Sequence, residues 1–319
     1  MNWLACLATA ASLVTVCGAA AQPAASSQTA AFRGDIATPE ALRAESFRLW
    51  PGRAPNAQSD APSETPSLTI YRPQNGRGNG TAVIIAPGGA YVGLASILEG
   101  LEPASWFTSR GVTVFVLTYR VGPAARLPTP LLDGARAVRF VRAHAADFHI
   151  DAGKIGIMGF SAGGHLAATT AVQATPGDAA AADPVDRLSS RPDFLILGYP
   201  WLEGMQLNAD GRSQYCDFAR LGGGPPCNPR DYVGFAPISK VTDGAPPTFI
   251  YHTTNDQLVP VLGSVRFYEA LVSHKVPVEM HLFESGSHGS GLGGASPTLS
   301  NWPELLQEWL RRRGLVPPT

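Results

Sequence analysis

The chain has 319 residues, 45% of them hydrophobic, which suffices for one large domain or two small ones with a buried core. Its formal net charge is −1 and charged residues make up 15%, so no strong electrostatic field favours nucleic acid or an anionic surface as a partner. Beyond the N-terminal segment, no apolar run is long enough to span a bilayer. We therefore expect neither a nucleic-acid partner nor a membrane span.

The first residues have the composition of a secretory signal peptide. Residues 3–17, WLACLATAASLVTVC, are apolar and uncharged, and Ala19 and Ala21 form a small-x-small cleavage pattern. This predicts a signal peptide over residues 1–21, cleaved after Ala21, and export to the periplasm or the medium. Two alternatives remain open. One is a lipid anchor on Cys17, which the bulky valine before it disfavours; the other is a mis-assigned start, because no Lys or Arg precedes the apolar run.

Residues 22–44 are small and polar without periodicity, which predicts a disordered leader in front of a folded domain over residues 45–319. Within that domain, short apolar runs typical of buried β-strands recur along the chain. They lie at residues 47–50, 68–71, 81–87, 112–119, 154–160, 193–200, 247–253 and 278–284. Apolar residues at helical spacing accompany them, at 131–146, 261–273 and 302–313. This alternation predicts the α/β class, with a mostly parallel sheet covered by helices on both faces.

The segments that follow the strands are the candidates for chemistry, because open α/β sheets bind their ligands at the carboxyl ends of the strands. The first such segment is PGGAY, residues 87–91. Its glycines let backbone N–H groups approach a ligand, and such donors stabilise the oxyanion that forms when an ester carbonyl is attacked. We expect the amides of Gly89 and Ala90 to be these donors, together with the amide of Ala162. Taken alone, a Gly-Gly pair after a strand is also common in ordinary turns.

A later strand end carries Ser161 in the pattern Gly-x-Ser-x-Gly, between an apolar run and an alanine-rich run. This context is typical of a nucleophile elbow, a sharp strand-to-helix turn that lifts a serine hydroxyl above the sheet. The motif alone is weak evidence in a chain with 34 glycines, and a plain tight turn is the alternative. The flanking strand and helix patterns favour the nucleophile.

Residues 201–243 interrupt the alternation, and their Gly- and Pro-rich composition predicts a small irregular cap over one end of the sheet. Cys216 and Cys227 lie here, whereas the other two of the four cysteines fall in the predicted signal peptide. In an exported protein this pair is a candidate disulfide that closes a loop. A zinc site is less favoured because no histidine lies at ligand spacing, and two free thiols are the third possibility.

Asp256 and His288 follow the last two predicted strands. A serine hydroxyl needs an imidazole to take its proton, and the imidazole needs a carboxylate to hold its tautomer. The chain order of Ser161, Asp256 and His288 is the order in which this arrangement occurs on α/β sheets. Glu284 is the reserve candidate for the acid.

The remaining histidines have structural interpretations. His165 lies one turn into the helix after Ser161 and is expected to pack, His252 and His281 lie inside apolar strands, and His274 is expected to cap a helix. No group of residues has metal-ligand spacing, and the chain has neither a phosphate loop nor a dinucleotide motif. The sequence therefore predicts no metal and no cofactor.

Together these motifs resemble the α/β-hydrolase fold and, within it, the bacterial acetyl-ester hydrolases that include acetyl xylan and feruloyl esterases. The resemblance runs from about residue 45 to the C-terminus and includes LWPG, AVIIAPGGAY, Glu99-Gly100, GFSAGGHLAA, HTTNDQLVPV and GSHGSGL. It implies that the nucleophile is Ser161, the acid Asp256 and the base His288. It also implies that residues 87–90 form the oxyanion loop.

The chain departs from that family in three places. The loop commonly has a third glycine where this chain has Ala90, which implies that this residue does not adopt a positive φ. Many relatives have an aspartate at the position of Asn255, so Asp256 is the only carboxylate of the turn here. The insertion at 201–243 is particular to this chain and is expected to shape the substrate pocket.

The expected function is hydrolysis of short acyl esters through an acyl-enzyme, with acetyl groups of plant-wall carbohydrate as the substrate that the resemblance implies. The partner is thus a small-molecule or polysaccharide ester. A serine peptidase of the same fold and a non-catalytic binding protein are the alternatives. The sequence contains no indication of the oligomeric state.

Overall fold

A computed structural model describes residues 45–73, 76–123, 125–294 and 296–317. The signal peptide expected over residues 1–21 and the leader expected over 22–44 lie outside the described residues. In the part of the chain that the structure describes, none of the helices has the length and apolar character needed to cross a bilayer.

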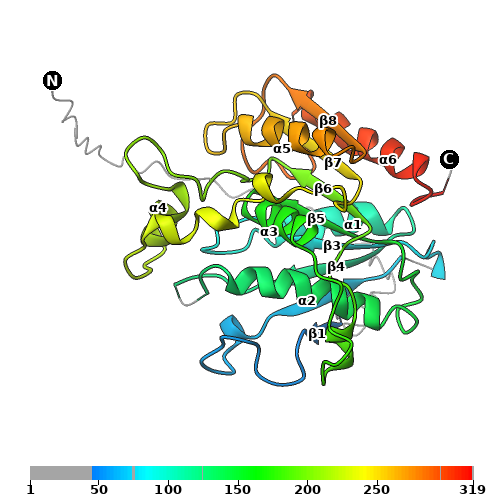
Figure 1. The fold of residues 1–319 in the computed structure, drawn as a ribbon. Coiled ribbons are helices and arrows are strands. Elements are labelled where there is room, and N and C mark those ends of the chain that lie inside the picture. The colour runs from blue at the N-terminus through cyan, green and yellow to red at the C-terminus, as the bar shows by residue number, and fades with distance from the viewer. Residues whose placement is uncertain (1–44, 74–75, 124, 295, 318–319) are drawn as a thin grey trace, which may run out of the picture. The chain divides into compact units, whose positions relative to one another are not determined.

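The centre of the domain is an eight-stranded sheet with the order β1-β2-β4-β3-β5-β6-β7-β8 (Figure 1). The strands are β1 (Ser46–Arg48), β2 (Ser67–Tyr71), β3 (Ala82–Ala86), β4 (Thr113–Thr118), β5 (Ile155–Phe160), β6 (Phe194–Gly198), β7 (Thr248–Thr253) and β8 (Val278–Phe283). β2 is antiparallel to both of its neighbours, and every pair from β4 to β8 is parallel. The carboxyl ends of β3, β5, β7 and β8 therefore meet at one edge of the sheet.

β5 lies in the middle of this sheet because its sequence is apolar on both faces. Ile157 pairs with Ile84 of β3 and with Leu195 of β6, and all six residues of β5 are buried. A continuous apolar run of this kind is typical of parallel strands that have helices on both sides.

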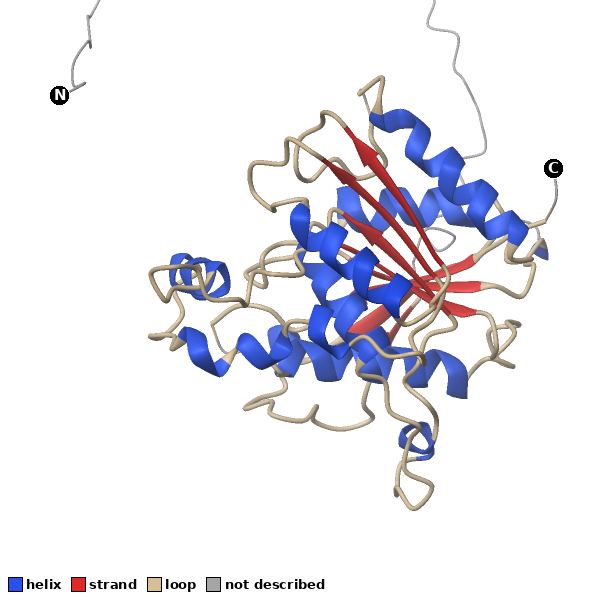
Figure 2. Ribbon diagram, turned by 45° about the horizontal axis from the view of Figure 1, so that its top comes forward, coloured by secondary structure: helices blue, strands red, loops and turns tan. Residues whose placement is uncertain are grey.

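Helices cover both faces of the sheet (Figure 2). On one face lie α2 (Thr129–Ala143), α3 (Ser161–Val172) and α5 (Leu262–Ser273), which bury Val138, Leu166 and Phe267 in one core cluster. On the other face lie α1 (Glu102–Thr108) and α6 (Trp302–Arg312), which bury Phe107 and Trp309 in a second cluster. The strand-helix alternation expected from the sequence is confirmed, with boundaries of the expected elements that differ by at most three residues.

Several elements, among them α1, were not expected. A π-helical turn, η4 (Ile97–Leu101), leads into α1, and the insertion at 201–243 contains the helix α4 (Gln214–Leu221). α4 begins at Ser213, whose side chain accepts a hydrogen bond from the backbone N–H of Cys216. Short 3-10 turns follow it at Pro229–Asp231, Val233–Phe235 and Ile238–Lys240. The insertion is therefore more regular than its Gly/Pro content indicated.

A disulfide bond joins Cys216 of α4 to Cys227. The two residues are 11 positions apart, so the bond closes a short loop within the insertion. In Figure 1 this part of the chain, labelled α4, lies at the left of the view, to one side of the sheet.

A buried ion pair lies where β4 leads into α2. Arg120 follows β4, and its guanidinium bonds both carboxylate oxygens of Asp133 on α2 at 2.6 to 3.1 Å. The backbone N–H of Arg120 donates a further bond to Asp133 at 2.9 Å. The two side chains are only 2% and 0% exposed. The pair therefore fastens the end of a strand to the helix that follows it.

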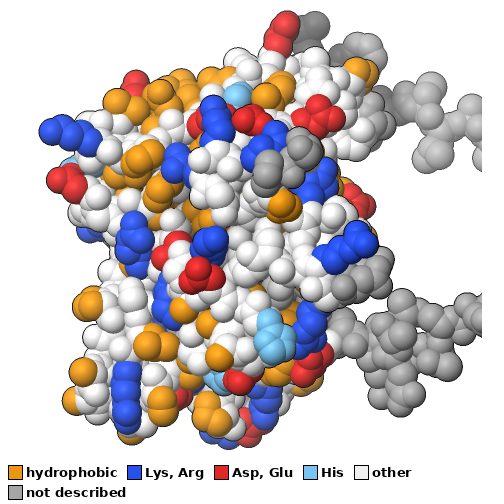
Figure 3. Space-filling model, turned by 90° about the vertical axis from the view of Figure 1, so that its right-hand side faces the viewer, with side chains coloured by type: hydrophobic (Ala, Val, Ile, Leu, Met, Phe, Trp, Pro, Cys, Tyr) orange, Lys and Arg blue, Asp and Glu red, His pale blue; other side chains and the backbone are white. Residues whose placement is uncertain are grey.

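On the face shown in Figure 3, basic and acidic side chains are intermingled with apolar ones. Some charged side chains of the domain are paired across elements, for example Arg312 of α6 with Glu279 of β8 at 2.5 Å. Such exposed pairs contribute little to the free energy of unfolding.

Candidate active site

Ser161 lies at the turn from β5 into α3 with a φ of 50°, a left-handed backbone conformation that is rare for a non-glycine residue. The glycines on either side make this turn possible. A Cβ at Gly163 would lie 2.0 Å from the carbonyl oxygen of Ala86, and a Cβ at Gly159 would lie 2.1 Å from the carbonyl oxygen of Gly163. Strand and helix thus pack backbone against backbone, which is the geometry of a nucleophile elbow.

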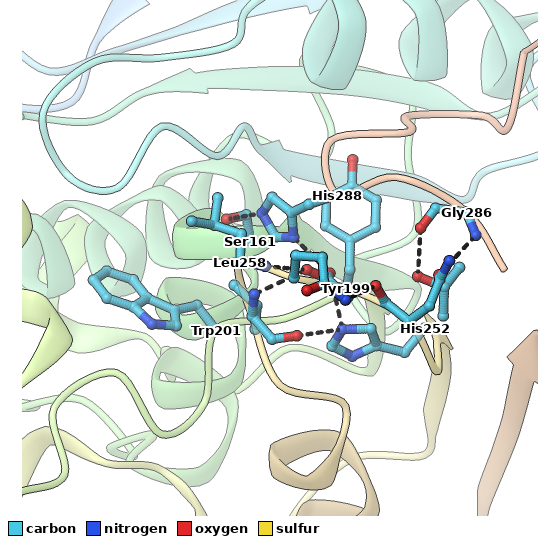
Figure 4. Close-up of polar contacts among 12 residues, drawn as sticks. Ser161, Tyr199, Trp201, His252, Leu258, Gly286 and His288 are labelled. Carbon is cyan, nitrogen blue, oxygen red and sulfur yellow. Dashed lines mark hydrogen bonds and ion pairs between the residues drawn. The ribbon is translucent and has the colours of Figure 1, made fainter. Parts of the chain in front are cut away.

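Three side chains from different strand ends meet in a single hydrogen-bonded chain (Figure 4). The Oγ atom of Ser161 is 2.8 Å from Nε2 of His288, and Nδ1 of His288 is 2.7 Å from Oδ2 of Asp256. With its proton on Nδ1, the imidazole donates to the carboxylate, and its Nε2 is free to accept from the serine hydroxyl. The structure therefore brings together the three residues predicted as nucleophile, base and acid.

Asp256 is held by more than His288. The backbone N–H groups of Leu258 and Val259 each donate to Oδ1 at 2.9 Å, and Nε2 of His252 is 3.2 Å from Oδ2. Burial raises the pKa of this carboxyl, but the hydrogen bonds of His252 and His288 and the amide of Val259 outweigh it, so the pKa is well below its usual range. The carboxylate therefore stays ionised beside the imidazole at neutral pH.

A cavity of about 220 Å³ opens beside Ser161. Its walls come from the oxyanion loop, from the turn after β7 and from the insertion. The lining residues are Gly89, Ala90, Ala95, Glu99, Ser161, Trp201, Phe218, Leu258, Val259 and His288. Most of this surface is apolar, and Trp201 lies beside Ser161 in Figure 4.

The loop after β3 can supply oxyanion donors next to the serine. The backbone N–H groups of Gly89 and Ala90 have no hydrogen-bond acceptor within the described parts of the chain, and both residues line the cavity. The amide of Ala162 lies in the first turn of α3, where helix N–H groups have no intrahelical partner. The amide of Gly88, in contrast, donates to Glu99 at 2.6 Å and is occupied.

The backbone of Ala90 corrects one implication of the family resemblance. Its φ is 55°, so the residue that replaces the usual glycine does adopt a positive φ, and Tyr91 after it has a φ of 61°. A left-handed conformation costs a residue with a Cβ about 1–2 kcal/mol. Buried contacts offset this strain, because the Tyr91 hydroxyl is 2.7 Å from Nδ1 of His165.

Two residues of this network were given no role in the site from the sequence. Glu99 of η4 lines the cavity and accepts from Gly88 and Tyr199. Burial raises the pKa of the Glu99 carboxyl, and the hydrogen bonds from Tyr199 and Gly88 only partly oppose this rise. His252 was interpreted as a sheet histidine without a role in the site, but it contacts Asp256. The signals available were a single acid in an otherwise apolar segment and the spacing of four between His252 and Asp256.

The rival residues have other partners or positions. Asp256 bonds Nδ1 of His288, and Glu284, the reserve candidate for the acid, is exposed on the surface. His165 is buried and bonds the carbonyl oxygen of Phe235 at 2.8 Å, which fits the expected packing role. His274 follows the end of α5 and pairs with Asp243 at 2.7 Å.

Across residues 45–317, where the structure describes them, no three His, Cys, Asp or Glu side chains gather as possible ligands of a metal ion. The chemistry available at the site is that of the hydrogen-bonded serine, imidazole and carboxylate beside backbone amides.

A mostly parallel sheet of this order, with a serine at the elbow after β5, defines the class of α/β hydrolases. The sequence matches the BD-FAE family over residues 68–271, and the chain belongs to that family.

Solved structures of similar proteins cover nearly the whole domain. The acetyl ester-xyloside bifunctional hydrolase from Caldicellulosiruptor lactoaceticus is 34% identical, with a TM-score of 0.75 over 86% of this chain and 98% of that one. The esterase Est2 from Thermogutta terrifontis, solved with propionate bound, is 27% identical, with a TM-score of 0.67 over 86% and 96% of the two chains.

Curated relatives are longer proteins. An acetylxylan esterase from Xylanibacter ruminicola is 28% identical over 253 residues, which are 76% of this chain and 48% of the relative. An endo-1,4-beta-xylanase B from Butyrivibrio fibrisolvens is 37% identical over 212 residues, which are 65% of this chain and 32% of the relative. The chain thus spans only about a third to a half of the length of these two relatives.

Proposed function

We propose that this protein is a serine carboxylesterase that removes short acyl groups, in particular acetyl groups, from carbohydrate such as acetylated xylan. The observation that carries the proposal is the unbroken chain from the Ser161 hydroxyl through His288 to Asp256, with distances of 2.8 and 2.7 Å, beside backbone N–H groups that have no acceptor among the described residues. This arrangement suits acyl transfer, in which a weak nucleophile must lose its proton as it attacks.

The reaction proceeds in two half-reactions. The Ser161 oxygen attacks the ester carbonyl while Nε2 of His288 accepts its proton, and Asp256 stabilises the imidazolium that forms. The amides of Gly89, Ala90 and Ala162 bind the negative oxygen of the tetrahedral intermediate. His288 then gives the proton to the leaving alcohol, and a water molecule repeats the sequence to release the acid from Ser161.

The size and composition of the cavity support a short acyl group. Its volume of about 220 Å³ is smaller than that of most sites for drug-sized ligands, which run from about 300 to 1,000 Å³. Carbohydrate as the alcohol is supported by the names of the relatives, an acetylxylan esterase and an acetyl ester-xyloside hydrolase.

Export is part of the proposal. The apolar segment at residues 3–17 and the small residues before position 22 support a signal peptide, and the disulfide of the insertion is of the kind that persists in oxidising compartments. N-terminal sequencing of protein secreted by an expressing cell tests this; mature protein that starts at Gln22 is the expected result.

A substrate panel tests the activity. Purified protein is offered p-nitrophenyl acetate, longer p-nitrophenyl esters, acetylated xylan, methyl ferulate and an aminoacyl anilide. We expect acetyl esters to be cleaved fastest and Ser161→Ala to lose at least about a thousandfold in kcat while it folds normally. Faster cleavage of the anilide would indicate a peptidase, and the absence of any turnover would indicate a binding protein.

A further inference from the structure

Glu99 is a buried carboxylate in the wall of the cavity that the mechanism above does not use. Its side chain belongs to η4, and the residue is 3% exposed. Each of its two oxygens accepts a hydrogen bond, and the two donors come from opposite sides of the site. We propose that Glu99 is a positioning residue that holds the oxyanion loop and the His288 loop in register with each other. The inference rests on the proposed function and deepens it.

The first bond fixes the oxyanion loop. The backbone N–H of Gly88 donates to Oε2 of Glu99 at 2.6 Å. Gly88 directly precedes Gly89 and Ala90, which line the cavity and whose own N–H groups have no acceptor among the described residues. The peptide plane that carries the N–H of Gly89 is held by its carbonyl oxygen, on Gly88, which accepts from Ala95 at 2.9 Å, and the plane of the Ala90 N–H by the carbonyl oxygen of Gly89, which accepts from Val92 at 2.9 Å. The bond from Gly88 to Glu99 anchors the start of this turn. An oxyanion hole depends on donors that are already in place before the charge develops.

The second bond reaches the loop that carries His288. The Tyr199 hydroxyl donates to Oε1 of Glu99 at 2.7 Å and accepts from the backbone N–H of Gly291 at 2.9 Å. The carbonyl oxygen of Gly291 accepts from the Tyr251 hydroxyl at 2.6 Å. Gly291 is therefore held on both sides of its backbone, three residues after the base.

Tyr199 also touches the base itself. Its ring meets the imidazole of His288 edge to face with centroids 4.9 Å apart, and Figure 4 shows the two side chains next to each other. A shift of Tyr199 would therefore move both the anchor of the loop and the surface against which His288 rests. Misplacement of a reacting group by about 1 Å can cost on the order of a hundredfold in rate.

A carboxylate suits this position because both of its oxygens are acceptors. A glutamine has the same shape, but its amide nitrogen is a donor and would face the N–H of Gly88 or the hydroxyl of Tyr199. Trp201 and Phe218, which form part of the apolar wall of the cavity, are not partners in these two hydrogen bonds. Loss of Glu99 should therefore disturb the alignment of the reacting groups more than the binding of the ester.

The test compares Glu99→Gln, Tyr199→Phe, the double variant and the control Glu102→Gln on p-nitrophenyl acetate. Glu102 is an exposed acid three residues further along, at the start of α1. Rates are expressed per active site, counted by complete titration of the serine with an organophosphonate. We expect Glu99→Gln to lower kcat by about a hundredfold, the size of effect that follows loss of an oxyanion donor. The KM of Glu99→Gln should stay within about twofold of the wild-type value. The kcat and the KM of Glu102→Gln should also stay within about twofold of wild type.

Tyr199→Phe tests the bond between Tyr199 and Glu99 separately from the bond between Gly88 and Glu99, because it removes the hydroxyl and keeps the ring. We expect about a tenfold loss of kcat, and a double variant no slower than Glu99→Gln alone, since the two side chains act through one shared bond. Wild-type kcat in Glu99→Gln would overturn the proposal, as would additive losses in the double variant. A wild-type protein that hydrolyses no ester would instead overturn the proposed function and this inference together.

Discussion

Two buried aspartates at the same edge of the sheet illustrate how similar surroundings serve different purposes. Asp133 and Asp256 both have fully buried side chains, and both accept backbone and side-chain hydrogen bonds. The partner of Asp133 is a guanidinium, which keeps its charge at every physiological pH. The partner of Asp256 is the imidazole of His288, whose other ring nitrogen lies 2.8 Å from the hydroxyl oxygen of Ser161.

The second difference is access to a reacting atom. Arg120 and Asp133 are closed off from solvent, whereas His288 lines the cavity and contacts Ser161 on its far side. On the proposed function, Asp133 is a structural carboxylate because its partner carries a fixed charge, and Asp256 serves the reaction because its partner reaches the proposed nucleophile. Substitutions that remove only the charge can separate the two roles.

The largest effect is expected for Asp256→Asn. An asparagine keeps the shape but no longer stabilises the imidazolium or favours the Nδ1 tautomer of His288, and the corresponding change in a serine protease lowers kcat about ten-thousandfold. Stability should change less than in the variant of Asp133, because an imidazole left behind can remain neutral. Steady-state kinetics with p-nitrophenyl acetate and urea unfolding measure the two quantities.

Glu284→Gln is the matched control for that experiment, since it alters the exposed acid that was the reserve candidate. Its kcat should stay within about twofold of wild type. If Glu284→Gln lost far more activity than Asp256→Asn, the acid would be Glu284, and Asp256 would belong with Asp133 among the structural carboxylates.

The next effect is expected for Asp133→Asn, and it is one of stability. The substitution leaves the guanidinium of Arg120, which is 2% exposed, without a counter-charge. Breaking one side of a buried ion pair costs about 3–5 kcal/mol in the free energy of unfolding. Protein that remains folded should keep its kcat per titrated serine, and a large loss of kcat at full stability would contradict the division between the two aspartates.

The sequence predicts features that neighbouring residues determine, and it does not predict contacts between residues that are distant in the chain. The strands, the elbow at Ser161 and the order of the three site residues follow from local patterns, because each lies directly after an apolar run. The ion pair of Arg120 and Asp133 has no local sequence pattern. Neither segment indicates that a helix residue 13 positions after the strand end will pack against it.

The same limit explains the two features of the site that the sequence did not predict, the contacts of Glu99 and the backbone of Ala90. Glu99 matters because η4 brings it against Gly88 and Tyr199, the latter 100 positions away. The positive φ of Ala90 could not be read from composition, since alanine ordinarily avoids that conformation and only the surrounding contacts impose it. Local patterns thus predicted the three side chains that the structure brings together, while the contacts of Glu99 and the backbone of Ala90 became visible only in the fold.

A dependence on pH should sharpen the comparison further. The pKa of Asp256 is lowered in the folded protein, so the folded state binds fewer protons than the unfolded state as the pH falls. Its contribution to stability is therefore fully present above the ordinary aspartate pKa of about 3.9 and is lost as the pH falls further. We expect the difference in the free energy of unfolding between wild type and Asp256→Asn to shrink from pH 6 to pH 3. A difference that stays constant over that range would show that the charge of Asp256 does not stabilise the fold.

The smallest effect concerns the pocket that distinguishes Asp256 from Asp133. Phe218 of α4 forms part of the cavity wall, so Phe218→Ala should make room for a longer acyl chain without touching any charge. One methylene in an apolar pocket is worth about 1–3 kcal/mol in selectivity, so kcat/KM for the butyrate ester relative to the acetate ester should rise about tenfold. Leu221→Ala, on the same helix but 76% exposed, is the control and should leave this ratio unchanged. An unchanged ratio in Phe218→Ala would mean that the acyl group lies elsewhere and that the wall formed by the insertion contacts the alcohol.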